Sequence, residues 1–330
     1  MAYRSEWLAQ VAEEILEPER PIVDPHHHFW TESSWGRYML DDLWADTSAG
    51  HRVEKTVFLE CRSQYLTDGP EHLRPVGETR FVAGLATEAD TGPALNARVG
   101  AIIGHANLLL GKQAREVLTA HMEASPLFRG IRHSASWDLE LSGPSAATDA
   151  HRYLDETFRE GFACLGDLGL SFDAWMFHPQ LPELADLARA FPDTTIILNH
   201  LGGPLGAGSY AENRDEVIDQ WQHNLTEVSE CPNVVVKVGG IAMPLNGFGW
   251  HERNLPPGSE ELADADRPFC EFAIQAFGAD RCMFESNFPV DKIGVSYPVL
   301  WNAFKRIVEN YSETDKEALF RGTATRVYRL

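Results

Sequence analysis

Two histidines near the start of the chain are spaced so that both could bind one ligand. They are His26 and His28, in the segment DPHHHFW of residues 24–30. Side chains two residues apart in a strand face the same side, and His27 between them should face the other side. At the carboxyl end of a barrel strand, the pair could bind one metal ion or one anionic group of a substrate. A histidine-rich turn without a function is the alternative.

Two later histidines follow apolar runs. His200 ends the run IILN and is closely followed by Gly202 and Gly203, where the backbone can approach a ligand. Its position at a strand end favours a catalytic role over that of an ordinary core histidine. His178 follows the run FDAWMF and precedes Pro179. It could be a third metal ligand or a histidine of a loop.

Acidic residues cluster in the segment CMFESNFPVDK of residues 282–292. We expect Glu285 and Asn287 to share one strand face and to point into the same cavity. A carboxylate there could accept the proton of an attacking water. Asp291, in the loop beyond, could have this role or could simply be solvated. Glu285 could instead pair with a buried base such as Lys237.

Two cationic residues also lie in or at the end of apolar runs. Lys237 interrupts the run VVVKV, so it belongs either to a structural ion pair or to the active site. Arg132 and His133, in the motif GIRHS, end another run and are candidates for substrate binding. A guanidinium fits a carboxylate, so Arg132 is expected to bind an acidic group of the substrate. A salt bridge from Arg132 to an acid such as Glu60 is the alternative.

Two tryptophans, Trp175 and Trp250, could line an apolar substrate pocket. Aromatic side chains at strand ends more often only pack in the core. Trp250 belongs to the glycine-rich segment GFGWHERN of residues 247–254, which could cover a substrate or be an ordinary surface insertion.

Parallel strands with helices between them could bring these residues together. Several apolar runs are continuous, as in parallel strands that are covered on both sides. The predicted strands are Ile22–Val23, Thr56–Glu60, Phe81–Leu85, Phe128–Ile131, Ala174–Phe177, Thr195–Leu198, Val234–Val238 and Cys282–Glu285. A helix is predicted over residues 182–191 from apolar residues at i, i+3, i+4 and i+7, and a capping box at 312–315 predicts another. Eight strands that alternate with helices favour a closed α/β barrel over an open sheet.

Composition limits the class of protein. The chain has 330 residues, of which 44% are hydrophobic, and a net charge of −21. We therefore expect one domain over residues 1–330 that binds a small molecule, and neither nucleic acid nor a membrane. Five scattered cysteines without a CxxC pair and no signal peptide predict a reduced, cytoplasmic protein. The connections over about residues 86–127 and 240–270 are predicted to be long. The sequence does not determine whether the chain forms a homo-oligomer.

The motifs together resemble those of the amidohydrolase-2 family. DPHHHFW, GIRH, the block from FHPQL to NHLGGP, VVVKVGG and RCMFESNFPV follow one another in that family's order, over about residues 21–330. The resemblance implies a distorted (β/α)8 TIM barrel with an N-terminal extension and long loops. It also implies an enzyme with His26, His28 and His200 in its site. Relatives in this family include lactonases and, at greater distance, aromatic-acid decarboxylases.

One position departs from the family pattern. Asn287 stands where the family usually has an Asp that ligates a metal or acts as a base. An amide cannot take up a proton and is a poor zinc ligand. Glu285 or Asp291 would then have this role, unless the chemistry differs from the usual hydrolysis.

The leading hypothesis is a hydrolase that opens a lactone or similar ester in a small carboxylated molecule. It would use a divalent metal, expected to be Zn²⁺, on His26 and His28, with His178 or His200 completing the coordination. Some lactonases of this family need no tightly bound metal, so a site that works without a metal is the alternative. The alternatives are a non-oxidative decarboxylase or C–C hydrolase of an aromatic acid, and a metabolite-binding barrel without activity.

Overall fold

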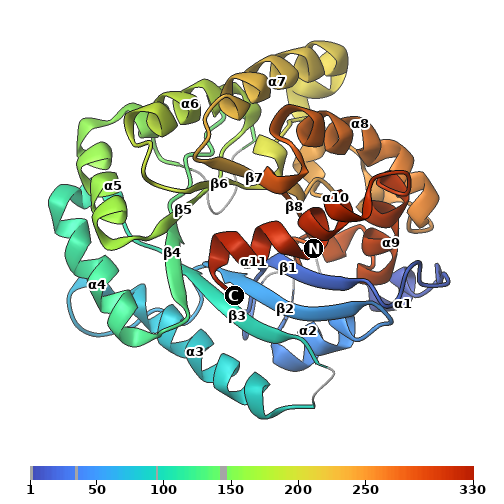
Figure 1. The fold of residues 1–330 in the computed structure, drawn as a ribbon, viewed down its shortest axis with the longest axis horizontal. Coiled ribbons are helices and arrows are strands. Elements are labelled where there is room, and N and C mark those ends of the chain that lie inside the picture. The colour runs from blue at the N-terminus through green and yellow to red at the C-terminus, as the bar shows by residue number, and fades with distance from the viewer. Residues whose placement is uncertain (1–2, 34–35, 94–95, 142–146) are drawn as a thin grey trace.

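Eight parallel strands form one sheet whose spatial order follows their order in the chain (Figure 1). The computed structural model describes residues 3–33, 36–93, 96–141 and 147–330. The strands are β1 Pro21–His27, β2 Arg52–Leu59, β3 Arg98–Gly104, β4 Phe128–Arg132, β5 Ser171–Ala174, β6 Ile196–Leu198, β7 Val234–Gly239 and β8 Cys282–Glu285. Helices surround the strands, so the expected (β/α)8 barrel is confirmed.

Helices lie around the outside of the barrel, except for the last one, which covers one end. They are α1 Ser5–Leu8, α2 Leu40–Thr47, α3 Val76–Thr91, α4 Ala114–Ala124, α5 Glu156–Leu168, α6 Leu181–Ala190, α7 Arg214–Ser229, α8 Ser259–Phe277, α9 Tyr297–Ile307, α10 Glu313–Glu317 and α11 Thr323–Tyr328. The helix predicted over 182–191 is α6, which has a proline in its first turn. The predicted cap of α10 is also present, since the Ser312 side chain accepts a hydrogen bond from the Asp315 backbone N–H. In the described ranges, no helix is long and apolar enough to cross a membrane.

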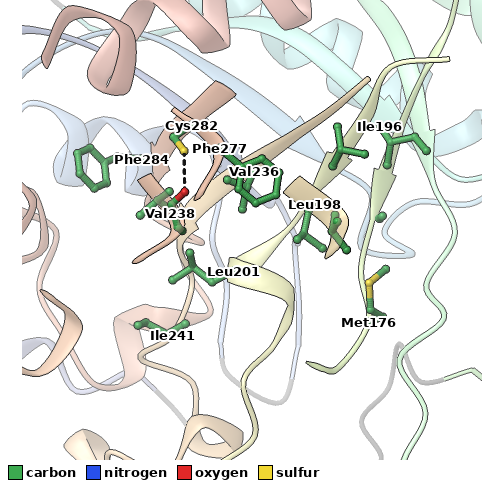
Figure 2. Close-up of a cluster of buried hydrophobic side chains, with 14 of the residues drawn as sticks. Met176, Ile196, Leu198, Leu201, Val236, Val238, Ile241, Phe277, Cys282 and Phe284 are labelled. Carbon is green, nitrogen blue, oxygen red and sulfur yellow. Dashed lines mark hydrogen bonds between the residues drawn. The ribbon is translucent and has the colours of Figure 1, made fainter. Parts of the chain in front are cut away.

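The strands bury both of their faces. On β7, Val236 and Val238 point outward and pack with residues of β6, β8 and α8 such as Phe277 (Figure 2). Val235 and Lys237 alternate with them and point into the barrel. This double burial explains why the sequence of β7 is a continuous apolar run with one charge in it.

The C-terminal helix α11 closes the end of the barrel where the strands begin. Its residues Ala324 and Tyr328 belong to the cluster that fills the barrel, together with Val57, Ile197 and Met283. Figure 1 shows α11 lying across the centre of the ring of strands. The opposite end of the barrel, where the strands finish, holds the polar residues described below.

The seam between β1 and β8 has few backbone contacts. Among the described residues, one parallel bridge joins His27 to Phe288, and the His28 N–H donates to the Phe288 carbonyl over 2.9 Å. Asp24 strengthens the seam, because it accepts hydrogen bonds from the Ser286 N–H at 3.0 Å and the Tyr297 hydroxyl at 3.0 Å. The barrel is therefore nearly closed, and hydrogen bonds to the Asp24 side chain join its two edges where backbone hydrogen bonds are few.

Two strand predictions were wrong in position. Residues Phe81–Leu85 lie inside α3, and the third strand is β3, at Arg98–Gly104 in the connection predicted to be long. A short apolar run fits a buried helix as well as a strand, and Val82, Leu85, Ala86 and Ala89 are the buried positions on one face of α3. The predicted strand Ala174–Phe177 shares only its first residue with β5.

Candidate active site

A polar layer lies directly above the apolar filling of the barrel. On four strands, a residue that points into the barrel is charged, and it lies two positions after an apolar or small residue that also points inward. These charged residues are Arg132, Asp173, Lys237 and Glu285. Arg132 is 5% exposed and the other three are 0% exposed. Burial of four charged groups is costly unless each has a partner, so their pairing defines the site.

Glu285 lies between two histidines. Its Oε1 is 2.7 Å from Nδ1 of His200 and accepts the His200 backbone N–H over 2.9 Å. Its Oε2 is 2.7 Å from Nδ1 of His26, within the distance of an ion pair, but has no hydrogen-bond partner among the described residues. The rings of His26 and His200 are 4.4 Å apart. One ligand atom from each of the three residues lies within 4.8 Å of the others.

The turn after β6 aims His200 at this cluster. His200 and Leu201 both have a positive φ, 53° and 55°, which residues with side chains rarely adopt. Gly240 approaches so closely that a Cβ on it would lie 2.0 Å from Nδ1 of His200. Gly240, after β7, therefore leaves room for the His200 ring beside Glu285.

Each cation of the polar layer has its own acid. Lys237 forms a 2.8 Å ion pair with Asp173 and not with Glu285, the partner considered from the sequence. Asp173 also accepts hydrogen bonds from Asn199 and, through α11, from Tyr328, each over 2.9 Å. Glu285 is therefore left without a cationic partner in this layer.

Arg132 forms the salt bridge that was the alternative to substrate binding. Its Nε donates to Glu60 Oε1 over 2.9 Å, and its Nη2 donates to the Glu60 carbonyl over 2.6 Å. Its Nη1 lies 3.4 Å from Nε2 of His26, and Lys237 Nζ lies 3.4 Å from Nδ1 of the same ring. Arg132 thus has a structural partner and still borders the cluster.

Burial favours the neutral form of the histidines in the site. Burial, with the charge of Lys237 next, holds the pKa of His26 well below its ordinary value. Burial also lowers the pKa of His200, although Glu285 opposes this, and burial and Arg132 lower that of His28. Neutral imidazole is the form that binds a metal or exchanges a proton with a neighbouring acid.

His28 shares the expected face with His26 but is not part of the three-residue cluster. The two rings are 5.0 Å apart, and His28 Nδ1 is hydrogen-bonded to the Leu59 carbonyl over 2.9 Å. This leaves Nε2 as the nitrogen that a ligand could use. His27 faces the other side, as predicted, and packs against Phe29 and Phe58.

Asn287 and Asp291 are placed differently from expectation. The strand ends at Glu285, and Asn287 has a φ of 54°, so it does not continue the strand face as predicted. Its amide donates to Asp291 Oδ1 over 2.8 Å, and the Ala242 N–H donates to Oδ2 over 3.1 Å. Asp291 is 0% exposed, so it is not solvated. Burial raises the pKa of Asp291 well above its usual range.

Of the remaining candidates, Trp175 contacts the cluster, since its ring lies 4.8 Å from the His200 ring. His178 Nδ1 accepts the Leu205 N–H over 3.3 Å. His133 and Trp250 also pack elsewhere: the His133 ring lies 5.2 Å from that of His105, and Trp250 stacks on Phe248.

Sequence reasoning missed two acids, Asp173 and Asp24. Asp173 was hidden in the run SFDAWMF, although a charge in an apolar strand was the signal that identified Lys237. Asp24 belongs to the DPHHH motif and joins β1 to β8, so it sets where His26 lies relative to Glu285. Burial raises the pKa of Asp24 to about 6.

The comparison with known families agrees with this geometry. A family model described as Amidohydrolase matches residues 23–330. The chain belongs to the amidohydrolase family. This amidohydrolase is 31% identical to protein y4mH of Sinorhizobium fredii, over 94% of this chain and 98% of that protein.

Two further relatives of this amidohydrolase come from Burkholderia multivorans. L-fucono-1,5-lactonase is 27% identical, over 93% of this chain and 96% of the lactonase. A crystal structure of an amidohydrolase with bound zinc has a TM-score of 0.74 and 23% identity, over 94% of this chain and 100% of that one. The structural likeness shows the shared fold, and the family assignment shows that this amidohydrolase is an enzyme.

Proposed function

We propose that this amidohydrolase opens a lactone or a similar ester in a small carboxylated molecule. The observation that carries the proposal is the buried carboxylate of Glu285 between the imidazoles of His26 and His200. Its Oε2 has no hydrogen-bond partner among the described residues, so it is the atom available to accept a proton from an attacking water. The lactonase among the relatives supports this class of bond.

The proton acceptor in this proposal is Glu285, and neither Asn287 nor Asp291. An amide cannot take up a proton. Both oxygens of Asp291 already accept hydrogen bonds from the protein. Glu285 therefore replaces the Asp that the family usually has two residues later.

A divalent metal fits the same cluster. Two imidazoles and one carboxylate are a common ligand set of catalytic zinc, and one ligand atom from each of His26, His200 and Glu285 lies within 4.8 Å of the others. A carboxylate that binds the ion through one oxygen keeps the other oxygen for the proton. We propose that His26, His200 and Glu285 hold Zn²⁺, with His28 Nε2 beside them and His178 outside the site. A bound Zn²⁺ supplies a Lewis acid and lowers the pKa of a bound water.

Arg132 and Lys237 would stabilise negative charge on the substrate. Both lie 3.4 Å from the His26 ring, so they border the place where the ester carbonyl would lie. A preorganised donor at a developing oxyanion contributes about 3 kcal/mol. Trp175, against the His200 ring, would supply an apolar wall.

A lactone panel tests this proposal. Purified protein, with and without added Zn²⁺ or Mn²⁺, is mixed with lactones that include L-fucono-1,5-lactone, and acid release is followed with a pH indicator. We expect turnover in the wild type and a loss of at least 100-fold in Glu285→Gln. The control Glu227→Gln, on the surface of α7, should keep the turnover of the wild type. Metal content per chain, measured separately by mass spectrometry, should fall in His26→Ala.

Two results would overturn the assignment. Acid release that survives Glu285→Gln would show that Glu285 does not accept the proton. Carbon dioxide release from an aromatic acid, with every lactone inert, would favour decarboxylation in the same barrel. Full activity of protein that holds no metal would keep the lactonase and remove the zinc.

A further inference from the structure

A groove of about 640 Å³ lies at the same end of the barrel as the candidate site. Its walls are formed by residues that follow β2, including Arg62, Tyr65 and Arg74, and by residues that follow β3, including His105. Loops after barrel strands are where substrates bind in this fold. The groove is therefore in a position to contact part of a substrate.

Two arginines of the groove have no acid partner. In the described ranges, no hydrogen bond or ion pair involves the guanidinium of Arg62 or Arg74, and Arg74 Nε is buried without a partner. Glu71 lines the same groove but pairs with neither. The residues outside the described ranges include no Asp or Glu. Two neighbouring guanidinium groups with neither an acid nor a carbonyl as partner are available to bind an anionic ligand.

The loop that carries Arg62 is held in an unfavourable conformation. Arg62 has a φ of 63°, which residues with a side chain rarely adopt. The buried carboxylate of Glu78 on α3 accepts the N–H groups on both sides of Arg62, from Cys61 over 3.0 Å and from Ser63 over 2.7 Å. Glu78 therefore holds the backbone on both sides of Arg62 in this conformation.

The groove adjoins the polar layer. His105 Nδ1 is hydrogen-bonded to the Arg132 carbonyl over 3.0 Å. Glu60, the partner of Arg132, is two residues before Arg62. In addition, the Tyr65 hydroxyl is buried without a hydrogen-bond partner among the described residues. The groove thus offers two cations and one neutral donor next to the residues that position Arg132.

We infer that Arg62 and Arg74 form a subsite for a carboxylate of the substrate, with the Tyr65 hydroxyl as a third donor. A guanidinium binds a carboxylate through two parallel hydrogen bonds. The inference rests on the proposed lactone hydrolysis and specifies its substrate as a lactone with a carboxylate outside the ring that opens. The ester would lie at Glu285 and the carboxylate over β2 and β3.

Binding and kinetics test the subsite separately. Binding of malonate is measured by titration calorimetry at low ionic strength for the wild type, Arg62→Gln and the control Arg115→Gln. Arg115 is an exposed arginine of α4 paired with Asp167, so its loss changes the net charge equally. We expect Arg62→Gln to weaken malonate binding about tenfold or more, and Arg115→Gln to leave it within a factor of two.

The kinetic test compares a carboxylated lactone with its neutral analogue. The ratio of their kcat/KM values should fall about tenfold in Arg62→Gln and partly recover in Arg62→Lys. Malonate binding and a ratio that both stay at wild-type values in Arg62→Gln would overturn the subsite. If no lactone is hydrolysed but malonate binding still depends on Arg62, the subsite stands and the proposed function fails.

Discussion

Tyr328 connects the C-terminal helix to the polar layer, so its hydroxyl should contribute to stability. The hydroxyl donates to Asp173 Oδ1 over 2.9 Å in a fully buried position. Asp173 has two other donors, Lys237 and Asn199, and both use the same oxygen. Tyr328→Phe would remove one of three donors to a buried carboxylate and leave the ring in place.

The expected loss follows from this geometry. A hydrogen bond to a charged group contributes about 1.5–3 kcal/mol, so Tyr328→Phe should lower the free energy of unfolding by about 2 kcal/mol. An unfolding entropy of about 2.1 cal/mol/K per residue converts this to a decrease of about 3 °C in Tm for a chain of this length. Because Asp173 also positions Lys237, kcat/KM for the lactone should decrease as well.

Urea unfolding followed by circular dichroism measures the change. The matched control is Tyr311→Phe, since the Tyr311 hydroxyl has no hydrogen-bond partner among the described residues and the ring is half-buried. Neutral substitutions change stability by up to about 0.5 kcal/mol. A smaller loss than this in Tyr328→Phe, or an equal loss in Tyr311→Phe, would refute the reasoning.

Two further substitutions are expected to have opposite effects, a gain of stability in one and a loss of activity in the other. Burial raises the pKa of Asp266 to about 8, so the folded state binds a proton that the unfolded state releases, and stability is lost as the pH rises toward 8. Asp266→Asn should therefore gain stability relative to the wild type by about 1.4 kcal/mol per pH unit between pH 5 and 7 in urea titrations, and a pH-independent difference would contradict this. Gly240→Ala should lower kcat/KM about 100-fold, because its Cβ would lie 2.0 Å from His200 Nδ1. Gly84→Ala, where a Cβ meets nothing within 4 Å, is its control, and equal activity in both variants would mean that His200 is not needed.

The anchors of the candidate site could be predicted from the sequence because of their positions in the strands. His26, His200 and Glu285 each lie at the end of an apolar run, and parallel barrel strands bring these ends together. The ring directions could not be predicted, since they depend on contacts between strands. His28 illustrates this, because the Leu59 carbonyl on β2 determines which of its nitrogens is free.

The errors came from runs whose length or geometry is ambiguous. Placing the fifth strand at Ala174–Phe177 put Asp173 outside it, so the acid that pairs with Lys237 was overlooked. The run at Phe81–Leu85 is equally apolar in a helix and in a strand. Asn287 was assigned to a strand face by its spacing, but spacing does not reveal a left-handed residue.

The weak seam of the barrel coincides with the proposed zinc ligands. His26 comes from β1 and Glu285 from β8, and at this seam the described residues have one backbone bridge, from His27 to Phe288 just after β8. An ion held by both would act as a clasp across the least hydrogen-bonded part of the wall. Occupancy of the site would then be coupled to the rigidity of the whole barrel, and loss of the ion would first increase local opening between β1 and β8.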